Sequence, residues 1–380
     1  MARAIYLHIP FCEQICYYCD FNKFFLKHQP VDQYVDALGK EIRMYAAQHP
    51  PEELIESVYI GGGTPTSMST DQLRRVIETV SSEFPLSKGA EFTVEVNPGS
   101  CSDEKMAMLK ETGVNRLSIG VQTFDAKLLK AINRDHKPMD ANKTIQLALS
   151  HGITDLSIDL MFGLPNQTME QWYDTLQQAL ELPITHISAY SLKVEPKTVF
   201  YQWERQGRLH RPSEDQEADM YNLLVSEAAK ADFQQYEISN FSRGQYQSRH
   251  NLVYWNNEEY YGFGAGAHGY LNVERYANHG PLPKYLKAIE SGKRPTFEEH
   301  SVPLFEQKEE FMFMGLRKLN GISLDEYESR YGEQVAETFP GVMDELIEEG
   351  LLVMDGEHIR LSTEGKLLGN QVFEKFLLGK

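Results

Sequence analysis

The chain has 380 residues, 41% of them hydrophobic, which is enough for one large core and a smaller second domain, because single cores stop growing near ~250–300 residues. Its 55 acidic and 37 basic residues give a formal net charge of −18, a field that repels phosphate backbones and argues against a nucleic-acid partner. No apolar run reaches the ~18–20 residues of a membrane span and nothing resembles a signal peptide, so we expect a soluble, cytoplasmic protein.

The first half of the sequence alternates short β-branched apolar runs with amphipathic helical stretches, which is the pattern of βα units and a parallel sheet. The predicted strands are 3–9, 55–60, 91–96, 116–121, 156–161 and 184–192. The predicted helices between them are 31–47, 70–84, 103–111, 141–150 and 168–181. Six such units predict an α/β fold with a partial (β/α)6 barrel over residues 1–192.

Three of the four cysteines follow the first predicted strand within eight residues, at Cys12, Cys16 and Cys19. Thiolates this close together usually hold a metal or a cluster, although small core packing and a zinc site completed by His8 are alternatives. The spacing favours a four-iron, four-sulfur cluster with three thiolate ligands, which leaves one iron open for another molecule. Cys101 lies in a different loop, and we expect it to be a free thiol.

Later predicted strands also end in glycines or polar residues, and parallel barrels carry their chemistry at these carboxyl ends. The second strand runs into Gly61-Gly-Gly-Thr-Pro65, where the missing Cβ atoms allow close backbone approach to a ligand. Each polar residue taken singly could be a helix cap or a surface group, but together they predict one polar rim. Those at or just beyond successive strand ends are Glu95, Gln122, Arg134 and Asp159.

Beyond residue 192 the alternation weakens, and a helix near 215–230 precedes an aromatic, glycine-rich segment at 246–272. We predict extra β structure and loops over the barrel mouth for 193–300, including the glycine-rich stretch 261–269. Helices at 307–319, 324–331 and 334–349, followed by a hairpin, predict a mostly helical, winged-helix-like domain over 301–380. The acidic run at 344–349 argues against DNA binding and favours a packing lid.

The spacing Cys12-x3-Cys16-x2-Cys19 resembles the signature of the radical S-adenosylmethionine (SAM) superfamily. The flanking Tyr6-Leu-His-Ile-Pro-Phe11 and Asp20-Phe21 resemble the oxygen-independent coproporphyrinogen oxidase group and, within it, its heme chaperone branch, the HemW family. The resemblance covers essentially the whole chain. It implies that the open iron chelates SAM, and that one electron delivered to the cluster cleaves SAM to a 5′-deoxyadenosyl radical.

The resemblance also implies roles for individual residues. An arginine suits the SAM carboxylate because its planar fork donates two parallel hydrogen bonds, and the glycine loop receives the amino group. His250 lies in an HNxxYW segment that has been proposed as a heme-binding element in that branch, although a histidine in a packed loop is the alternative. The implied SAM contacts are Tyr6, Tyr18, Gly62, Gly63, Thr64, Glu95, Gln122, Arg134 and Asp159.

Two functions compete on this basis: a heme chaperone that passes heme to acceptor hemoproteins, and an oxygen-independent coproporphyrinogen III oxidase. The oxidase carries a fourth cysteine where this chain has Phe21, which favours the chaperone and predicts that coproporphyrinogen III dehydrogenase activity is absent. A tRNA-modifying enzyme is disfavoured by the net charge. The expected partners are heme, acceptor hemoproteins, a reductant such as a flavodoxin or ferredoxin, and a membrane surface in peripheral contact.

Overall fold

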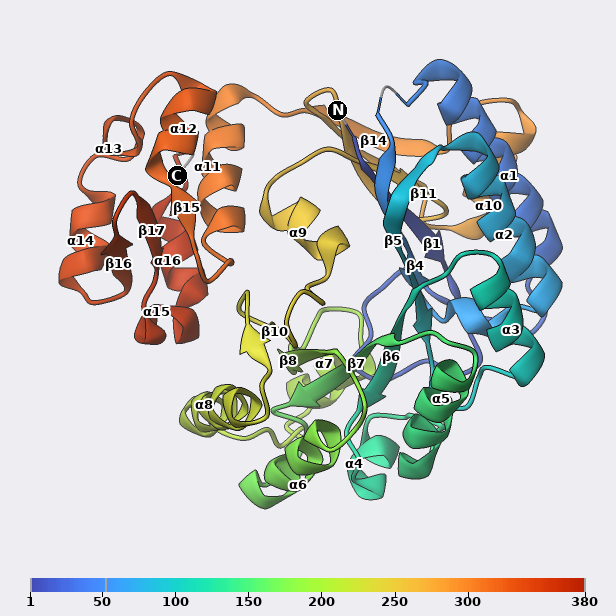
Figure 1. Ribbon diagram of the computed structural model, residues 1–380, viewed down its shortest axis with the longest axis horizontal. Coiled ribbons are helices and arrows are strands. Elements are labelled where there is room, and N and C mark those ends of the chain that lie inside the picture. The colour runs from blue at the N-terminus through green and yellow to red at the C-terminus, as the bar shows by residue number, and fades with distance from the viewer. Residues whose placement is uncertain (1, 52, 379–380) are drawn as a thin grey trace.

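A twelve-stranded sheet organises the computed structural model, which describes residues 2–51 and 53–378 (Figure 1). At its centre six parallel strands follow one another in chain order, as the sequence predicts. They are β1 (Ala4–Ile9), β4 (Ile55–Gly62), β5 (Leu86–Val96), β6 (Arg116–Gln122), β7 (Asp155–Phe162) and β8 (His186–Ser191). The partial barrel is confirmed.

Helices cover the outer face of this sheet (Figure 1). Those predicted are α1 (Val31–Gln48), α2 (Thr70–Glu83), α3 (Asp103–Glu111), α5 (Pro138–Ser150) and α6 (Met169–Leu180). Two of them begin at capping boxes, Ser69 with Gln72 and Thr168 with Gln171, which satisfy the free N–H groups of the first turn. The short helices η1 (Pro65–Ser67), α4 (Ala126–Ala131) and α7 (Val199–Arg205) were not predicted.

The sheet continues beyond the barrel on both sides. Beside β1 lies the parallel strand β11 (Tyr260–Phe263), followed by the antiparallel strands β12 (His268–Leu271), β13 (Glu274–Asn278) and β14 (Thr296–Ser301). At the other edge, β10 (Asn240–Ser242) and β9 (Gln234–Gln235) follow β8. The glycine-rich stretch 261–269 therefore extends the sheet, whereas we expected it at the barrel mouth. Gly262 is required there because a Cβ would meet the carbonyl oxygen of His268 at 1.7 Å.

Three helices accompany these added strands: α8 (Glu214–Lys230), α9 (Arg249–Trp255) and α10 (Leu282–Glu290). Helix α9 carries the HNxxYW segment, for which we expected a loop, and it packs between β4 and the C-terminal helices (Figure 1). The two-stranded sheet β2 (Phe11–Cys12) and β3 (Phe24–Phe25) closes the base of the cysteine loop, which we define as residues 10–22. No helix among the described residues is both long and apolar enough to span a bilayer.

The C-terminal part forms a second core around Phe311, Met312, Tyr327 and Ile359. Its elements match a winged-helix-like domain, in the order α11 (Leu304–Gly315), β15 (Ile322–Ser323), α12 (Leu324–Tyr331), α13 (Val335–Thr338), α14 (Val342–Glu348), β16 (Leu352–Asp355), β17 (His358–Leu361), α15 (Thr363–Leu367) and α16 (Gly369–Lys375). The single helix predicted over 334–349 is wrong: Gly341 takes a φ of 77°, so the chain breaks into α13 and α14. The domain boundaries stay predictions.

A buried carboxylate ties helix α1 to the added strands. Glu41 is fully buried and accepts hydrogen bonds from the backbone N–H of Gly264 (2.9 Å), Asn278 Nδ2 (2.6 Å) and the Tyr285 hydroxyl (2.5 Å). Burial raises the pKa of Glu41 from 4.5 to about 7. The folded state therefore prefers the protonated acid, and this contribution to stability is complete below about pH 4.5 and is lost as the pH rises through about 7.

Glu41→Gln is expected to remove this pH dependence. From about pH 4.5 to about pH 8, the free energy of unfolding of the wild type should fall by on the order of 3 kcal/mol more than that of the variant. Urea denaturation at a series of pH values measures the difference. Parallel pH profiles for the two proteins would show that Glu41 does not titrate in the folded state.

Candidate functional site

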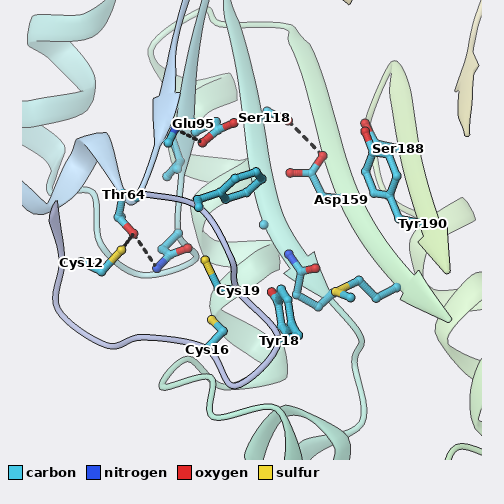
Figure 2. Close-up of a pocket in the computed structure, with 18 of the residues that line it drawn as sticks. Cys12, Cys16, Tyr18, Cys19, Thr64, Glu95, Ser118, Asp159, Ser188 and Tyr190 are labelled. Carbon is cyan, nitrogen blue, oxygen red and sulfur yellow. Dashed lines mark hydrogen bonds between the residues drawn. The ribbon is translucent and has the colours of Figure 1, made fainter. Parts of the chain in front are cut away.

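A cavity of ≈ 430 Å³ lies inside the barrel at the carboxyl ends of the parallel strands; we call it the barrel cavity. The cysteine loop forms one wall, and strands β4 to β8 form the opposite wall (Figure 2). Figure 2 shows Cys16 and Cys19 on the loop facing Asp159, Ser188 and Tyr190 across this space. The site thus lies where the chemistry of parallel barrels is normally found.

The polar interior of the barrel follows from the two-residue period of a strand, which sends alternate side chains to opposite faces. On β6, Leu117, Ile119 and Val121 are buried in the hydrophobic core. The alternate residues of that strand, Arg116, Ser118, Gly120 and Gln122, line the cavity instead. The same alternation brings Ser157, Asp159 and Met161 of β7, and His186, Ser188 and Tyr190 of β8, to the cavity wall.

The cysteine loop holds three free thiols at this wall. Cys12 is buried and Cys16 and Cys19 are half-buried, and the N–H of Cys19 donates to the carbonyl of Cys16 (3.2 Å) in a tight turn. Asn133 anchors the loop from outside by donating to the carbonyl of Ile15 (2.8 Å). Burial raises the pKa of the Cys12 thiol to about 12, so this sulfur needs a bound cation to become a thiolate ligand at neutral pH.

These thiols do not form a site for a single metal ion. Among the described residues, no group of three or more His, Cys, Asp or Glu side chains converges closely enough to hold one ion. This disfavours the zinc alternative that used His8, whose Nε2 lies 2.7 Å from the carbonyl oxygen of Asn22. It is compatible with a cluster, because thiolates bound to different irons stand farther apart than ligands of one ion.

The glycine loop, residues 61–64, lies directly against the cysteine loop. The N–H of Gly63 donates to the carbonyl of Ile9 and that of Thr64 to the carbonyl of Phe11, both at 2.8 Å. A Cβ on Gly63 would meet Cys12 Sγ at 2.9 Å, and one on Gly62, where φ is +114°, would meet the His8 ring at 2.6 Å. The glycines therefore allow the two loops to pack with backbone exposed to the cavity.

Arg134 reaches the cavity from the segment after β6. Its Nη1 donates to Asn97 Oδ1 (2.6 Å) and its Nη2 to the hydroxyl of Tyr18 (3.2 Å). Its Nε is buried without a hydrogen-bond partner among the described residues. Such an unpaired donor beside a cavity is suited to binding an anionic group of a ligand.

Two carboxylates face the same cavity. Glu95 accepts from the Tyr59 hydroxyl (2.8 Å) and from the N–H of Gly62 (3.0 Å), and burial raises its pKa to about 7. Asp159 accepts from Ser118 Oγ (3.0 Å), and burial raises its pKa as well. A bound cation would offset this desolvation and favour both carboxylates in their charged form.

Most residues that the resemblance assigns to SAM meet at this cavity. Those lining it are Tyr18, Gly62, Gly63, Thr64, Glu95, Gln122, Arg134 and Asp159. Gln122 does so with a left-handed backbone, at a φ of 65°. Tyr6 is not among the lining residues; its ring packs beside Tyr59 at a centroid distance of 6.2 Å.

His250 lies behind the wall of the cavity. It is 1% exposed, with its Nδ1 3.0 Å from Ser57 Oγ and its Nε2 2.9 Å from the Tyr254 hydroxyl. Both ring nitrogens therefore have protein partners, as in the packed-histidine alternative. An iron atom could reach Nε2 only if the hydrogen bond to Tyr254 were broken.

Sequence reasoning missed several residues of the cavity wall. Asn97 holds Arg134, Tyr59 holds Glu95, and Ser118 holds Asp159. The signal for Ser118 was present, because polar or small residues alternate with Val, Ile, Leu or Ala along β6, β7 and β8. Tyr59 follows the same alternation on β4, whereas Asn97 lies just beyond the end of β5. Such alternation in strands that are covered by helices on their outer face indicates a polar interior.

Comparison with known proteins agrees with these observations. Residues 6–179 match the model of the radical SAM superfamily, and residues 303–368 match the HemN C-terminal domain. The chain is 46% identical over 377 residues to the heme chaperone HemW of Bacillus subtilis, covering 99% of both chains. It is 33% identical over 382 residues to the heme chaperone HemW of Escherichia coli, covering 98% of both.

A solved structure shows the same fold. Coproporphyrinogen III oxidase (HemN) from Escherichia coli superposes with a TM-score of 0.86 over 99% of this chain and 90% of that chain, at 23% sequence identity. Membership of the radical SAM superfamily implies a [4Fe-4S] cluster and SAM as cofactors. The chain belongs to the HemW family of the radical SAM superfamily.

Proposed function

We propose that this protein is a heme chaperone, which binds heme and transfers it to acceptor hemoproteins. The observation that carries the proposal is the end-to-end similarity to HemW relatives, at 46% identity over 99% of both chains for the first of them. Phe21 supports it, because its side chain lines the mouth of the barrel cavity and is 63% exposed where the oxidase has a further cysteine. Cluster thiolates need a reducing compartment, which favours the cytoplasm.

We assign the [4Fe-4S] cluster to Cys12, Cys16 and Cys19, with SAM beside it in the barrel cavity. The fit rests on two features: the cavity-lining backbone of Gly62 and Gly63, which packs too closely against His8 and Cys12 to admit a Cβ, and the orphaned Nε of Arg134. When bound together, the two cofactors supply one-electron reductive cleavage of SAM. The residues of this chain bind and orient them and exclude water from the barrel.

Each assigned residue has a distinct task toward SAM. Arg134 offers Nε to the carboxylate, while Asn97 and Tyr18 hold its guanidinium in place. The backbone at Gly62, Gly63 and Thr64 receives the amino group. Glu95, Gln122 and Asp159 also line the cavity, and we assign Glu95 and Gln122 to the ribose and Asp159 to the nucleoside.

The heme site is assigned to the HNxxYW segment, with His250 as the candidate iron ligand. Coordination through Nε2 requires α9 to release the Tyr254 hydroxyl, so heme would enter after a local movement of this helix. A flavodoxin- or ferredoxin-type reductant, the acceptor hemoproteins and peripheral contact with a membrane complete the proposed partners.

The function is tested by heme and porphyrin assays on protein whose cluster has been reconstituted anaerobically. We expect one heme to bind per chain with a shift of the Soret band, and heme to pass to an apo-hemoprotein added in excess. With coproporphyrinogen III, SAM and a reductant, we expect no protoporphyrinogen. Stoichiometric turnover of the porphyrinogen without stable heme binding would instead establish the oxidase alternative.

A further inference from the structure

Helix α9 is fixed against the barrel strands by its first residues. Glu91 of β5 accepts hydrogen bonds from the backbone N–H groups of Arg249 (2.9 Å) and His250 (3.1 Å). Ser57 of β4 contacts the ring of His250 through its Oγ, 3.0 Å from Nδ1. These contacts hold the histidine ring in one orientation, with its face toward Tyr59. Tyr59 lies two residues after Ser57 on β4, so its side chain is on the same face of the strand.

The His250 ring stacks on Tyr59, with a centroid distance of 5.2 Å and an interplanar angle of 26°. Tyr6 covers Tyr59 from another side, at 6.2 Å and 26°. Tyr59 therefore contacts two rings, and it lines the barrel cavity. There it donates to Glu95 Oε1 at 2.8 Å.

Glu95 in turn is bound to the glycine loop. Its second oxygen accepts from the N–H of Gly62 at 3.0 Å, and a Cβ on Gly61 would lie 2.8 Å from its carboxyl carbon. A displacement of Tyr59 would thus shift Glu95 and the loop together. His250 itself does not line the cavity, and Tyr59 is the cavity-lining residue on which its ring stacks.

We propose that His250 is a positioning residue of the SAM site, which holds Tyr59 so that the Tyr59 hydroxyl fixes Glu95 and the glycine loop. The inference deepens the proposed function and rests on its assignment of SAM to the barrel cavity. It gives the HNxxYW segment a task that does not require iron. His250→Phe retains a flat ring against Tyr59 and removes every atom that binds iron, at the loss of the contacts with Ser57 and Tyr254.

The experiment measures the dissociation constant of SAM by equilibrium dialysis with the cluster-loaded protein. Tyr59→Phe is expected to weaken SAM binding by about 10-fold, because one hydrogen bond to a charged group is lost. His250→Ala is expected to weaken it to a similar extent, and the double variant should be no weaker than about 10-fold, since both changes break one chain of contacts. His250→Phe should stay within about 3-fold of wild type.

His300→Ala serves as the control, because His300 lies on the exposed strand β14 and pairs with Glu306. It should leave SAM binding unchanged. Bound iron and the melting temperature are recorded for every variant, and His250→Gln replaces His250→Ala if the alanine protein does not fold. The electron paramagnetic resonance spectrum of the reduced cluster gives a second readout, since its change on addition of SAM should need higher SAM concentrations in the weakened variants.

Wild-type SAM affinity in His250→Ala would overturn the inference, as would multiplicative effects of the two single substitutions in the double variant. Equal losses for His250→Phe and His250→Ala would also overturn it, because the ring would then have no positioning role. Failure of the wild type to bind heme would contradict the proposed chaperone function alone, since none of these SAM measurements involves heme.

Discussion

Replacing Cys16 by serine is expected to abolish the visible absorption of the reconstituted protein and to lower bound iron from about four atoms per chain to below about one. A serine hydroxyl does not ionise at neutral pH, and the remaining Cys12 and Cys19 cannot hold three corners of a four-iron cluster. Cys16 is half-buried at the cavity wall, so the change removes a ligand without opening the hydrophobic core. Absorption spectra and iron analysis measure both effects.

Cys101→Ser is the matched control, because it removes the remaining thiol of the chain. Cys101 is half-buried against the hydrophobic core, and burial raises its pKa to about 11, so it carries little thiolate at neutral pH. We expect this variant to keep its iron and its absorption. Loss of the cluster in Cys101→Ser would mean that a fourth thiolate reaches it.

Gly63→Ala should have the second largest effect. The added methyl group would lie 2.7 Å from the carbonyl oxygen of Phe11 and 2.9 Å from Cys12 Sγ, and backbone cannot yield as a flexible side chain can. We expect a loss of about 1–3 kcal/mol in folding stability from overpacking. Cluster content should fall by more than about half and SAM binding by at least about 10-fold, because Cys12 is pushed from its place and the backbone at the cavity is displaced.

Gly369→Ala provides the comparison for that prediction. Gly369 begins helix α16 in the C-terminal domain, and a Cβ there would find its nearest neighbour, Phe373, at 3.4 Å, an ordinary contact. Melting temperature, iron content and the SAM dissociation constant should match the wild type. If Gly63→Ala behaved like Gly369→Ala, the two loops would not be packed as tightly as their geometry indicates.

The barrel strands were predictable because each lies between the outer helices and the cavity. Each strand therefore alternates apolar residues with polar or small ones within a short stretch of sequence. In Arg116–Gln122, apolar residues alternate with the polar and small residues that reach the cavity, and a window of seven residues contains the whole signal. The strand-end residues could likewise be grouped without coordinates, because all carboxyl ends of a parallel sheet lie at one edge. Glu95 and Gln122 were brought together on that ground, whereas Arg134 follows helix α4 and Asp159 lies within β7.

Contacts between residues that lie far apart in the sequence were not predictable from the local sequence pattern. Ser57 meets His250 across 193 positions, and nothing in the HNxxYW segment indicates that its histidine faces β4. Helix α9 is only seven residues long, too short for a helical period to stand out. The break at Gly341 differs, because a proline followed by a glycine is a local helix-ending signal that the long prediction over 334–349 ignored.

One contact of the cysteine loop joins residues that the ribosome makes far apart in time. Asn22, at the end of that loop, donates through Nδ2 to the carbonyls of Ala265 (2.7 Å) and Gly280 (3.0 Å). The thiols are thus synthesised early, but the carbonyl groups that anchor their loop are made some 240 residues later. At a translation rate of ~5–20 residues per second, this delay is more than about ten seconds. The anchor of the cysteine loop is therefore complete only after strand β13 has been made, and until then the nascent thiols depend on the reducing power of their surroundings.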